Sequence, residues 1–345
     1  MRKHILLFAL LFLGAFQSFS QWNSLSLDTK ASFRAIRSLG SHIWIGGTRG
    51  TVIHSSDGGE HFSVSRVPGA DSLDFRDLAI LDEHTVLLMS AGPAENGAAK
   101  IFRTENGGKS WELAFQIKDK GYFFDAILWE GKQGLVLSDP AGPFYGLIRI
   151  SDKGRSYELL NPINHPNLQK GEAAFAASGS SLQKTKKGYY IVTGGGEKAC
   201  VLYSTDGLKW ESKYDETPGG EGTGFFSLGV RNPKNLWVAG GNYSRIKEGP
   251  VPVLESKDGG TTWAPVAGAP GYYVEKMLWA APYWILSGPA ESSAFDPKTK
   301  RWISLGKSPY HNITQVGNRI YGVGGRGQIG FISLSQIQQL FLSKE

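Results

Sequence analysis

The segment Ser256-Lys257-Asp258-Gly259-Gly260-Thr261-Thr262-Trp263 predicts the fold of this chain, because altered copies of it recur along the sequence. Each copy is centred on an acidic or amide residue: Asp57, Asn106, Asp152, Asp206, Asp258 and Asp296. Successive copies lie 49, 46, 54, 52 and 38 residues apart. A turn motif that repeats at about 50 residues is typical of radially arranged sheets, in which each repeat forms one blade of a propeller.

The number of blades follows from the aromatic residue that ends each motif and begins a short strand. Six such residues follow the motifs: Phe62, Trp111, Tyr157, Trp210, Trp263 and Trp302. A seventh strand of this kind begins at Trp22, whereas the strand expected at 327–333 has no aromatic strand after it. We therefore predict a seven-bladed β-propeller of four-stranded antiparallel blades, with the last blade closed by the N-terminal strand. Such closure leaves no unpaired inner edge.

The two ends of the chain differ from the repeats. Residues 1–20 combine Arg2 and Lys3 with an apolar run over 5–16 and then small residues, which predicts a signal peptide. The run is too short for a membrane span. Because there is no cysteine near residue 20, we expect no lipid anchor. We expect residues 21–345 to form a single propeller, exported to the periplasm or secreted. Its tail over 335–342 has apolar residues at helical spacing and is expected to cover an apolar patch as a short helix or strand.

Composition narrows the function classes. Cys200 is the only cysteine, so no intramolecular disulfide can form. The formal net charge of +6 comes from 37 basic and 31 acidic residues that are dispersed along the chain. A nucleic-acid-binding protein would cluster its basic residues on one face or stripe, so we expect no nucleic-acid partner. We expect a monomer.

The six repeated acidic or amide residues are interpreted as structural. The side chain of each accepts backbone hydrogen bonds across its turn, and the glycines supply the left-handed conformation. A calcium site is the alternative, but it needs six or more oxygen ligands and each turn offers one carboxylate. These turns are also expected on the face opposite the one where propellers bind ligands.

The ligand-binding face, here called the mouth, is expected to lie where the loops leave each second strand and enter each inner strand. The inner strands are predicted to begin at Phe33, Phe75, Phe124, Phe175, Phe226, Tyr273 and Tyr310. Candidate ligand-binding residues around the mouth are Arg34, Arg49, Arg76, Asp125, Glu197, Asn242, Tyr243 and Arg326. Tyr243, Tyr272, Tyr273 and Trp284 are candidates for an aromatic platform, with packing between blades as the alternative. The loop 161–171 is an alternative occupant of the mouth.

Catalytic motifs give little support for an enzyme. Gly322-Val323-Gly324-Gly325-Arg326-Gly327 matches the dinucleotide pattern, but a strand rather than a helix is expected after it. The sequence has no phosphate-binding loop, no His-Glu-x-x-His pair and no nucleophile elbow, so we expect no cofactor and no metal. A Ser-His-Asp triad stays open, because its members need not be adjacent. Asp139, Glu172 and Glu221 are the candidate catalytic acids, since glycoside cleavage needs two carboxyl groups.

The chain resembles the exported bacterial propellers related to the photosystem II stability/assembly factor, within the group that carries BNR or Asp-box repeats. The resemblance covers residues 22–333 and rests on the six turns, here called Asp boxes, and on three internal segments. These segments are Phe124-Asp125-Ala126-Ile127, Ser138-Asp139-Pro140 and the run 171–179. The resemblance implies a seven-bladed assembly or scaffold protein. Sialidases also carry Asp boxes, but the proline expected after Ile36 in their early arginine motif is replaced by Arg37.

Two hypotheses follow for the function. The first is an exported, non-catalytic, assembly-factor-like scaffold that binds a protein or glycan at the mouth. The second is a glycoside hydrolase or lyase that acts on an extracellular polysaccharide through the mouth carboxylates. If the chain is an enzyme, this class is favoured over an oxidoreductase.

Overall fold

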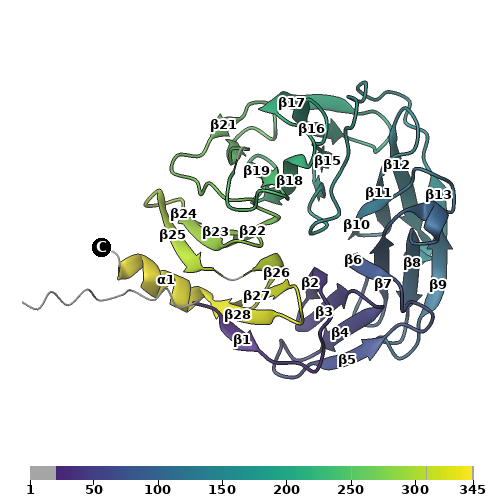
Figure 1. Cartoon of the computed structure of the whole chain (residues 1–345), viewed down its shortest axis with the longest axis horizontal. Helices are drawn as coiled ribbons and strands as arrows, with labels where there is room; N and C mark the ends of the chain where they lie inside the picture. The colour runs from purple at the N-terminus through teal and green to yellow at the C-terminus, as the bar shows by residue number, and fades with distance from the viewer. Residues whose placement is uncertain (1–20, 250, 308, 344–345) are drawn as a thin grey trace, which may run out of the picture.

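The computed structural model describes residues 21–249, 251–307 and 309–343, so the predicted signal peptide lies outside the described residues. Seven four-stranded antiparallel sheets form a ring around a central axis (Figure 1). The seven-bladed prediction is therefore confirmed. Each blade runs from an inner strand at the axis to an outer strand at the rim.

The first three blades follow the chain order without interruption. Blade 1 contains β2 (Phe33–Leu39), β3 (His42–Gly47), β4 (Thr51–Ser55) and β5 (Ser63–Arg66). Blade 2 contains β6 (Asp74–Ile80), β7 (Val86–Ala91), β8 (Lys100–Thr104) and β9 (Glu112–Gln116). Blade 3 contains β10 (Phe124–Glu130), β11 (Gln133–Pro140), β12 (Tyr145–Ser151) and β13 (Ser156–Leu159).

The next three blades repeat this order. Blade 4 contains β14 (Leu182–Thr185), β15 (Gly188–Val192), β16 (Lys198–Ser204) and β17 (Glu211–Pro218). Blade 5 contains β18 (Thr223–Val230), β19 (Leu236–Asn242), β20 (Leu254–Ser256) and β21 (Ala264–Pro265). Blade 6 contains β22 (Lys276–Ala280), β23 (Tyr283–Ser287), β24 (Ser292–Asp296) and β25 (Arg301–Gly306).

Blade 7 joins the two ends of the chain. It contains β26 (Tyr310–Val316), β27 (Arg319–Gly324), β28 (Ile329–Ser333) and the N-terminal β1 (Asn23–Leu25). β1 pairs antiparallel with β28, with Asn23 opposite Phe331 and Leu25 opposite Ile329. The predicted closure by the N-terminal strand is therefore confirmed, and it fastens the ring through hydrogen bonds rather than a covalent link.

The tail forms the helix α1 (Leu334–Leu342) on the outside of the ring beside blades 6 and 7 (Figure 1). Ser333 begins it with a capping box, because its side chain accepts the Gln336 N–H while the Gln336 side chain accepts the Ser333 N–H. Ile337 and Phe341 are buried in the core between blades 6 and 7. The tail thus covers an apolar patch, as the helical spacing predicted.

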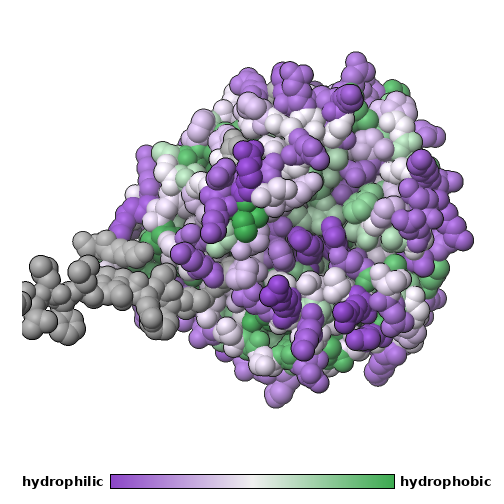
Figure 2. Space-filling view, in the orientation of Figure 1, coloured by the Kyte–Doolittle hydropathy of each residue, from purple (hydrophilic) through white to green (hydrophobic). Residues whose placement is uncertain are grey.

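Packing between blades supplies the core. Aromatic side chains at the Asp boxes reach the neighbouring sheet: Trp111 contacts Trp44 edge to face, with ring centroids 6.0 Å apart, and Phe62 contacts Tyr321 in the same way at 6.1 Å. Hydrophilic side chains cover most of the face shown in Figure 2, and hydrophobic ones gather there only in small patches. The described residues include no helix long and apolar enough to cross a membrane.

Candidate functional site

The mouth is built by a feature that recurs on five inner strands. In β2, β6, β10, β18 and β26 the pairing with the second strand shifts by one residue near the beginning of the inner strand. Such a bulge leaves one residue unpaired and re-aims its side chain. The five extra residues are Arg34, Arg76, Asp125, Phe226 and His311, and every one of them lines the same cavity. The bulges therefore direct five side chains into one cavity.

Three of the predicted strand starts need correction. In blade 5, Phe225 pairs with Gly240 and Phe226 is the bulged residue. Phe225, one residue before the predicted Phe226, therefore takes the position that Phe33 takes in blade 1. In blade 4, β14 begins only at Leu182, and Phe175 lies in the loop before it. In blade 6, β22 begins at Lys276, after Tyr273. Aromatic residues alone did not distinguish a strand start from a loop residue.

A loop closes the axial channel beneath the mouth. The segment 172–181, here called the plug, precedes β14 and lies at the axis of the ring. The Ser178 hydroxyl donates to the carbonyl of Glu275 (2.7 Å), and Asn312 Nδ2 donates to the carbonyl of Ser178 (3.0 Å). The Ser180 hydroxyl donates to the Ser227 hydroxyl (2.9 Å). The plug follows the loop 161–171, the alternative occupant of the mouth, and it gives the cavity a floor rather than filling it.

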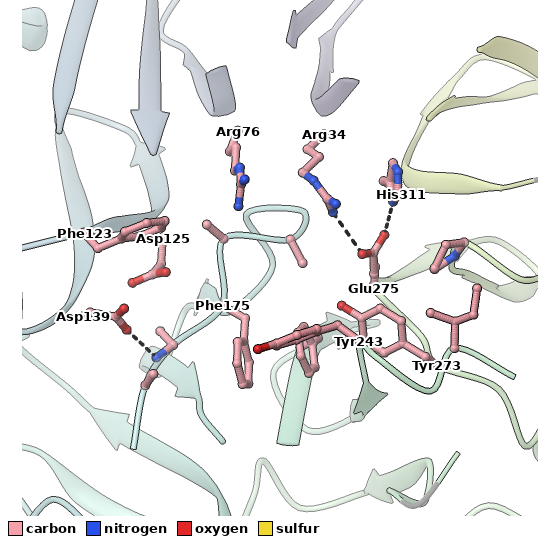
Figure 3. A pocket seen from close by; sticks show the side chains of 17 residues that line it. Arg34, Arg76, Phe123, Asp125, Asp139, Phe175, Tyr243, Tyr273, Glu275 and His311 are labelled. Carbon is pink, nitrogen blue, oxygen red and sulfur yellow. Dashed lines mark hydrogen bonds and ion pairs between the residues drawn. The ribbon is translucent and has the colours of Figure 1, made fainter. Parts of the chain in front are cut away.

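The cavity above the plug has a volume of about 550 Å³. It is lined by side chains from blades 1, 2, 3, 5, 6 and 7 and by the plug: Arg34, Arg76, Phe123, Asp125, Asp139, Ala173, Ala174, Phe175, Ala176, Ala177, Phe226, Tyr243, Ile246, Tyr273, Glu275, Pro289 and His311. Of the predicted residues, it brings together Arg34, Arg76, Asp125, Asp139, Tyr243 and Tyr273. These residues define the candidate site (Figure 3).

One wall of the cavity holds an ion-pair cluster. Glu275 is buried, and its carboxylate binds Arg34 Nη1 at 3.0 Å and His311 Nδ1 at 2.5 Å (Figure 3). Burial by itself would raise the pKa of Glu275, but the His311 and Arg34 contacts outweigh it and the pKa is lowered. Burial works against the charge of Arg34, and Glu275 raises the pKa of the guanidinium above its usual value. The cluster is therefore a fixed set of charges facing the cavity.

Glu275 and His311 were missed among the predicted ligand residues. His311 follows Tyr310 as Arg34 follows Phe33, so the aromatic-plus-one pattern could have identified it. Glu275 carries no such signal, because it precedes β22, which begins without the bulge seen in five of the other inner strands.

The opposite wall holds two carboxyl groups. Asp125 is buried, and Asp139 Oδ1 accepts the Ala174 N–H at 3.0 Å (Figure 3). Burial and the neighbouring Asp139 raise the pKa of Asp125 well above its usual value, against the opposing effect of Arg76. Burial raises the pKa of Asp139 to about 7, although the Ala174 N–H acts in the other direction. We call Asp125 and Asp139 the acid pair.

Glu172 does not line the cavity. Its carboxylate accepts hydrogen bonds from the Thr193 hydroxyl (2.9 Å), the Tyr145 hydroxyl (3.2 Å) and the Gln169 N–H (2.9 Å). These bonds turn it toward a separate cavity of about 230 Å³, which it lines together with Glu197. Its position in the chain predicted the correct face, but two of its partners lie at the start of β12 and directly after β15, which no local sequence signal could indicate.

The remaining predicted polar residues lie around the cavity rather than in it. Glu221, Arg49 and Arg326 are exposed. Asn242 is buried and holds a loop, because its amide donates to the Thr223 hydroxyl (2.7 Å) and the Glu221 carbonyl (3.1 Å). These four residues do not line the cavity, and their role in ligand binding or catalysis stays a prediction.

The aromatic platform is smaller than predicted. Tyr243 is 52% exposed and Tyr273 is buried, and both line the cavity. Tyr272 donates to Ser293 inside blade 6 (3.1 Å), and Trp284 stacks on Trp237 with ring centroids 4.7 Å apart. Packing between blades, the alternative interpretation, accounts for these two.

Most Asp boxes share one hydrogen-bond pattern. Asp258 Oδ1 accepts the N–H groups of Thr261 and Thr262, both at 2.9 Å, and the Ser256 hydroxyl at 2.9 Å. Asp57, Asn106 and Asp206 repeat this arrangement, and Asp296 accepts from Lys298 and Thr299. Asp152 differs, since its turn is a short 3-10 helix in which its carbonyl accepts the Arg155 N–H. Within the described ranges, no group of three or more His, Cys, Asp or Glu side chains could hold a metal ion.

The dinucleotide-like run 322–327 lies in a hairpin. Its first three residues end β27, and β28 begins at Ile329. A helix N-terminus, which a dinucleotide pyrophosphate needs, does not follow it.

The fold and the cavity define a class: a seven-bladed propeller with Asp boxes, a closed axial channel and one charged cavity at its mouth. The model of the family described as Photosynthesis system II assembly factor YCF48 matches residues 20–269. The chain belongs to this family.

Named relatives are about a quarter identical to this chain over the aligned residues. The photosystem II stability/assembly factor HCF136 of Arabidopsis thaliana is 24% identical over 263 residues, which are 71% of this chain and 59% of that protein. The photosystem II assembly protein Ycf48 of Synechococcus sp. (strain JA-2-3B'a(2-13)) is 24% identical over 294 residues, or 70% of this chain and 78% of that protein.

Two solved structures share the fold. The structure described as YCF48 bound to D1 peptide has a TM-score of 0.66 and 15% identity, and the match covers 91% of this chain and 97% of that one. YCF48 from Cyanidioschyzon merolae has a TM-score of 0.68 and 13% identity, with coverages of 91% and 99%. At this identity the likeness supports the fold alone.

Proposed function

We propose that this chain is an exported, non-catalytic scaffold that holds a segment of a partner protein in the mouth cavity. The observation that carries the proposal is the cavity itself, with its volume of about 550 Å³ and its lining of fixed charges and aromatic rings. Ligand pockets of roughly 300–1,000 Å³ combine apolar walls with a few placed polar groups, and this cavity has that composition.

The walls of the cavity suit a peptide with side chains of mixed character. Arg34 and Arg76 can bind carboxylates or backbone carbonyls, and the acid pair can bind donors. Phe175, Phe226 and Tyr243 offer ring faces for apolar side chains, with Phe175 and Phe226 stacked at 3.8 Å. The plug closes the floor, so a ligand enters and leaves by one side.

The family supports a protein partner. Its relatives are named assembly factors, and one solved structure is described as bound to a D1 peptide. We extend from these relatives only the general idea of holding a protein segment. The partner of this chain is proposed to be an envelope protein rather than a photosystem subunit, because the sequence shows no other photosynthetic feature.

A second candidate function is glycoside hydrolysis or lysis, favoured by the acid pair. Of the three predicted acids only Asp139 lines the cavity, so the pair would be Asp125 and Asp139. Release of reducing ends from an envelope polysaccharide, abolished in both Asp125→Asn and Asp139→Asn, would support this candidate over the scaffold.

Site-specific photocrosslinking tests the scaffold. The photoreactive residue p-benzoylphenylalanine replaces Tyr243, which is half exposed at the cavity, and in a control protein it replaces Leu113, which is exposed on the outer strand β9. After illumination in the producing cell's envelope, mass spectrometry should map the Tyr243 crosslinks to one segment of one protein. Crosslinks that are identical from both positions, or that carry only polysaccharide, would contradict the proposal.

A matched pair of variants then locates the contact. Arg76→Gln removes a charge from the cavity, and Arg49→Asn removes one from the same face outside it. Asn suits the left-handed backbone at position 49, where φ is 61°. The crosslink should weaken in the Arg76 variant and persist in the Arg49 variant.

A further inference from the structure

We propose that the acid pair, Asp125 and Asp139, is a subsite for one cationic group of the bound segment, either a lysine ammonium or an arginine guanidinium. This inference rests on the proposed function and goes beyond it, because it names the chemistry of one ligand side chain.

The first observation is an unpartnered oxygen. Asp125 is 1% exposed, and its Oδ2 is buried without a hydrogen-bond partner among the described residues. Asp125 nevertheless lines the cavity, and its carboxyl group lies at the cavity wall beside Asp139 (Figure 3). A buried polar atom left without a partner costs about 1–3 kcal/mol, which a bound donor would remove.

The protein's own cations do not satisfy this oxygen. Arg76 is the cation that acts on Asp125, but its Nε donates to Asp74 Oδ2 at 2.8 Å on the same strand, β6. Arg34 is bound to Glu275 on the far wall (Figure 3). The acid pair can therefore accept a hydrogen bond from a positively charged donor that enters the cavity.

The surroundings indicate that the cation is carried on an apolar stem. Phe175 lies on the same side of the cavity as the acid pair (Figure 3), and Phe226, which stacks on Phe175, and Tyr243 line the same cavity. The methylene chain of Lys or Arg packs on such surfaces while its charged end reaches a polar group. Ring faces also attract cations directly. A small inorganic cation has no methylene chain to pack on these rings, and two carboxyl groups are too few ligands for calcium.

Protonation couples to this binding. The charged and titratable groups that interact with the acid pair are Arg76 from β6 and Tyr145 from β12, in addition to the two carboxyl groups themselves. With the pKa of Asp139 raised to about 7 by burial, part of the empty protein carries a proton there at neutral pH. A bound cation favours the ionised form, so binding releases protons and strengthens as the pH rises from about 5 to about 8.

The test uses three amino-acid probes with blocked ends: Nα-acetyl-lysine methylamide, Nα-acetyl-arginine methylamide and Nα-acetyl-norleucine methylamide. Norleucine has an apolar chain similar to that of lysine and lacks the ammonium group. Binding is measured by titration with ¹H–¹⁵N NMR at pH 8. We expect the lysine or the arginine probe, or both, to bind about tenfold more tightly than norleucine. The two charged probes show which cation the subsite prefers.

Two further comparisons make the test specific. In Asp139→Asn, which keeps an oxygen to accept the Ala174 N–H, the preference for the cationic probe should fall several-fold. In Glu221→Gln, which removes an exposed carboxylate outside the cavity, the preference should be unchanged. In the unmutated protein at pH 5 the preference should also shrink, and this comparison needs no variant to fold.

Equal affinity of all three probes at pH 8 would overturn the inference. A preference that survives in Asp139→Asn would overturn it as well. Failure here is distinguishable from failure of the proposed function. Equal probe affinities together with a partner crosslinked at position 243 would leave the scaffold standing without this subsite. A cation preference without a crosslinked partner would support the subsite alone.

Discussion

Arg37 on β2 binds both carboxylate oxygens of Asp77 on β6, with Nε–Oδ1 at 3.0 Å and Nη2–Oδ2 at 2.9 Å. The Asp77 side chain is fully buried, and Oδ2 also accepts the Ile127 N–H of β10 (2.9 Å). Arg37 Nη2 in turn donates to the carbonyl of Gly179 in the plug (3.3 Å). One charge pair therefore connects three blades and holds the plug that floors the cavity.

Removing Asp77 should be costly. Asp77→Ala leaves the Arg37 guanidinium without its carboxylate and the Ile127 N–H without its acceptor, so we expect a loss of about 3 kcal/mol in unfolding free energy. The measurement is the shift of the urea unfolding midpoint followed by circular dichroism. Asp71→Ala is the control, since Asp71 is 78% exposed and lies 4.0 Å from Arg66. A control shift as large as that of Asp77→Ala would contradict the assigned role.

The plug depends on a glycine. Gly179 has φ of 67°, and an added Cβ would collide with the Asp77 carboxylate. Gly69 has a similar φ of 73°, and an added Cβ there meets nothing within 4 Å. Gly69→Ala should cost only the backbone strain, about 1 kcal/mol, whereas Gly179→Ala should cost clearly more and also alter NMR signals of Arg37 and Ser227. Equal midpoint shifts would show that the plug is not packed against Asp77.

The acid pair makes stability depend on pH. Because burial raises the folded-state pKa of Asp139 to about 7, the folded protein holds a proton that the unfolded chain releases at lower pH. Stability from this group is present at acidic pH and is lost as the pH rises from about 4 to about 7. Asp139→Asn should therefore become more stable relative to the unmutated protein across this interval, by about 4 kcal/mol in total at pH 8. A difference that is independent of pH would contradict the raised pKa.

The sequence predicted the architecture because its signals are local. Each Asp box and its aromatic residue lie within eight residues of one another, and the seventh aromatic strand, predicted to begin at Trp22, indicated how the ring closes. The candidate site was predicted only in part. Arg34, Arg76 and Asp125 were among the predicted residues, and each directly follows an aromatic residue that was predicted to begin an inner strand. The bulge at each of these positions directs the side chain into the cavity. Glu172 and Glu275 could not be placed, since their orientations depend on partners in other blades.

Helix α1 should contribute to the closure of the ring. Phe341 stacks on Tyr283 of β23 with ring centroids 5.1 Å apart, and it is buried, whereas the adjacent Leu342 is 60% exposed. Phe341→Ala should lower the unfolding free energy by about 3 kcal/mol through the cavity it creates, and Leu342→Ala by less than about 0.5 kcal/mol. Thermal unfolding of the two variants provides the comparison. Equal melting temperatures would mean that the helix adds nothing to the core.

The Asp boxes provide a test in which the chain contains its own control. Asp258→Ala removes the acceptor of the Thr261 and Thr262 N–H groups and should cost about 1–2 kcal/mol. Asp258→Asn should cost much less, because Asn106 already accepts the Ser110 N–H in the same position of blade 2.

The Thr262 hydroxyl and the backbone N–H groups lower the pKa of Asp258 to about 2, so the stability that its carboxylate contributes is present above about pH 4 and is lost as the pH falls toward 2. Unfolding midpoints from pH 2 to 7 should therefore converge at low pH for the unmutated protein and Asp258→Ala. Curves that stay parallel would show that the carboxylate does not stabilise the turn.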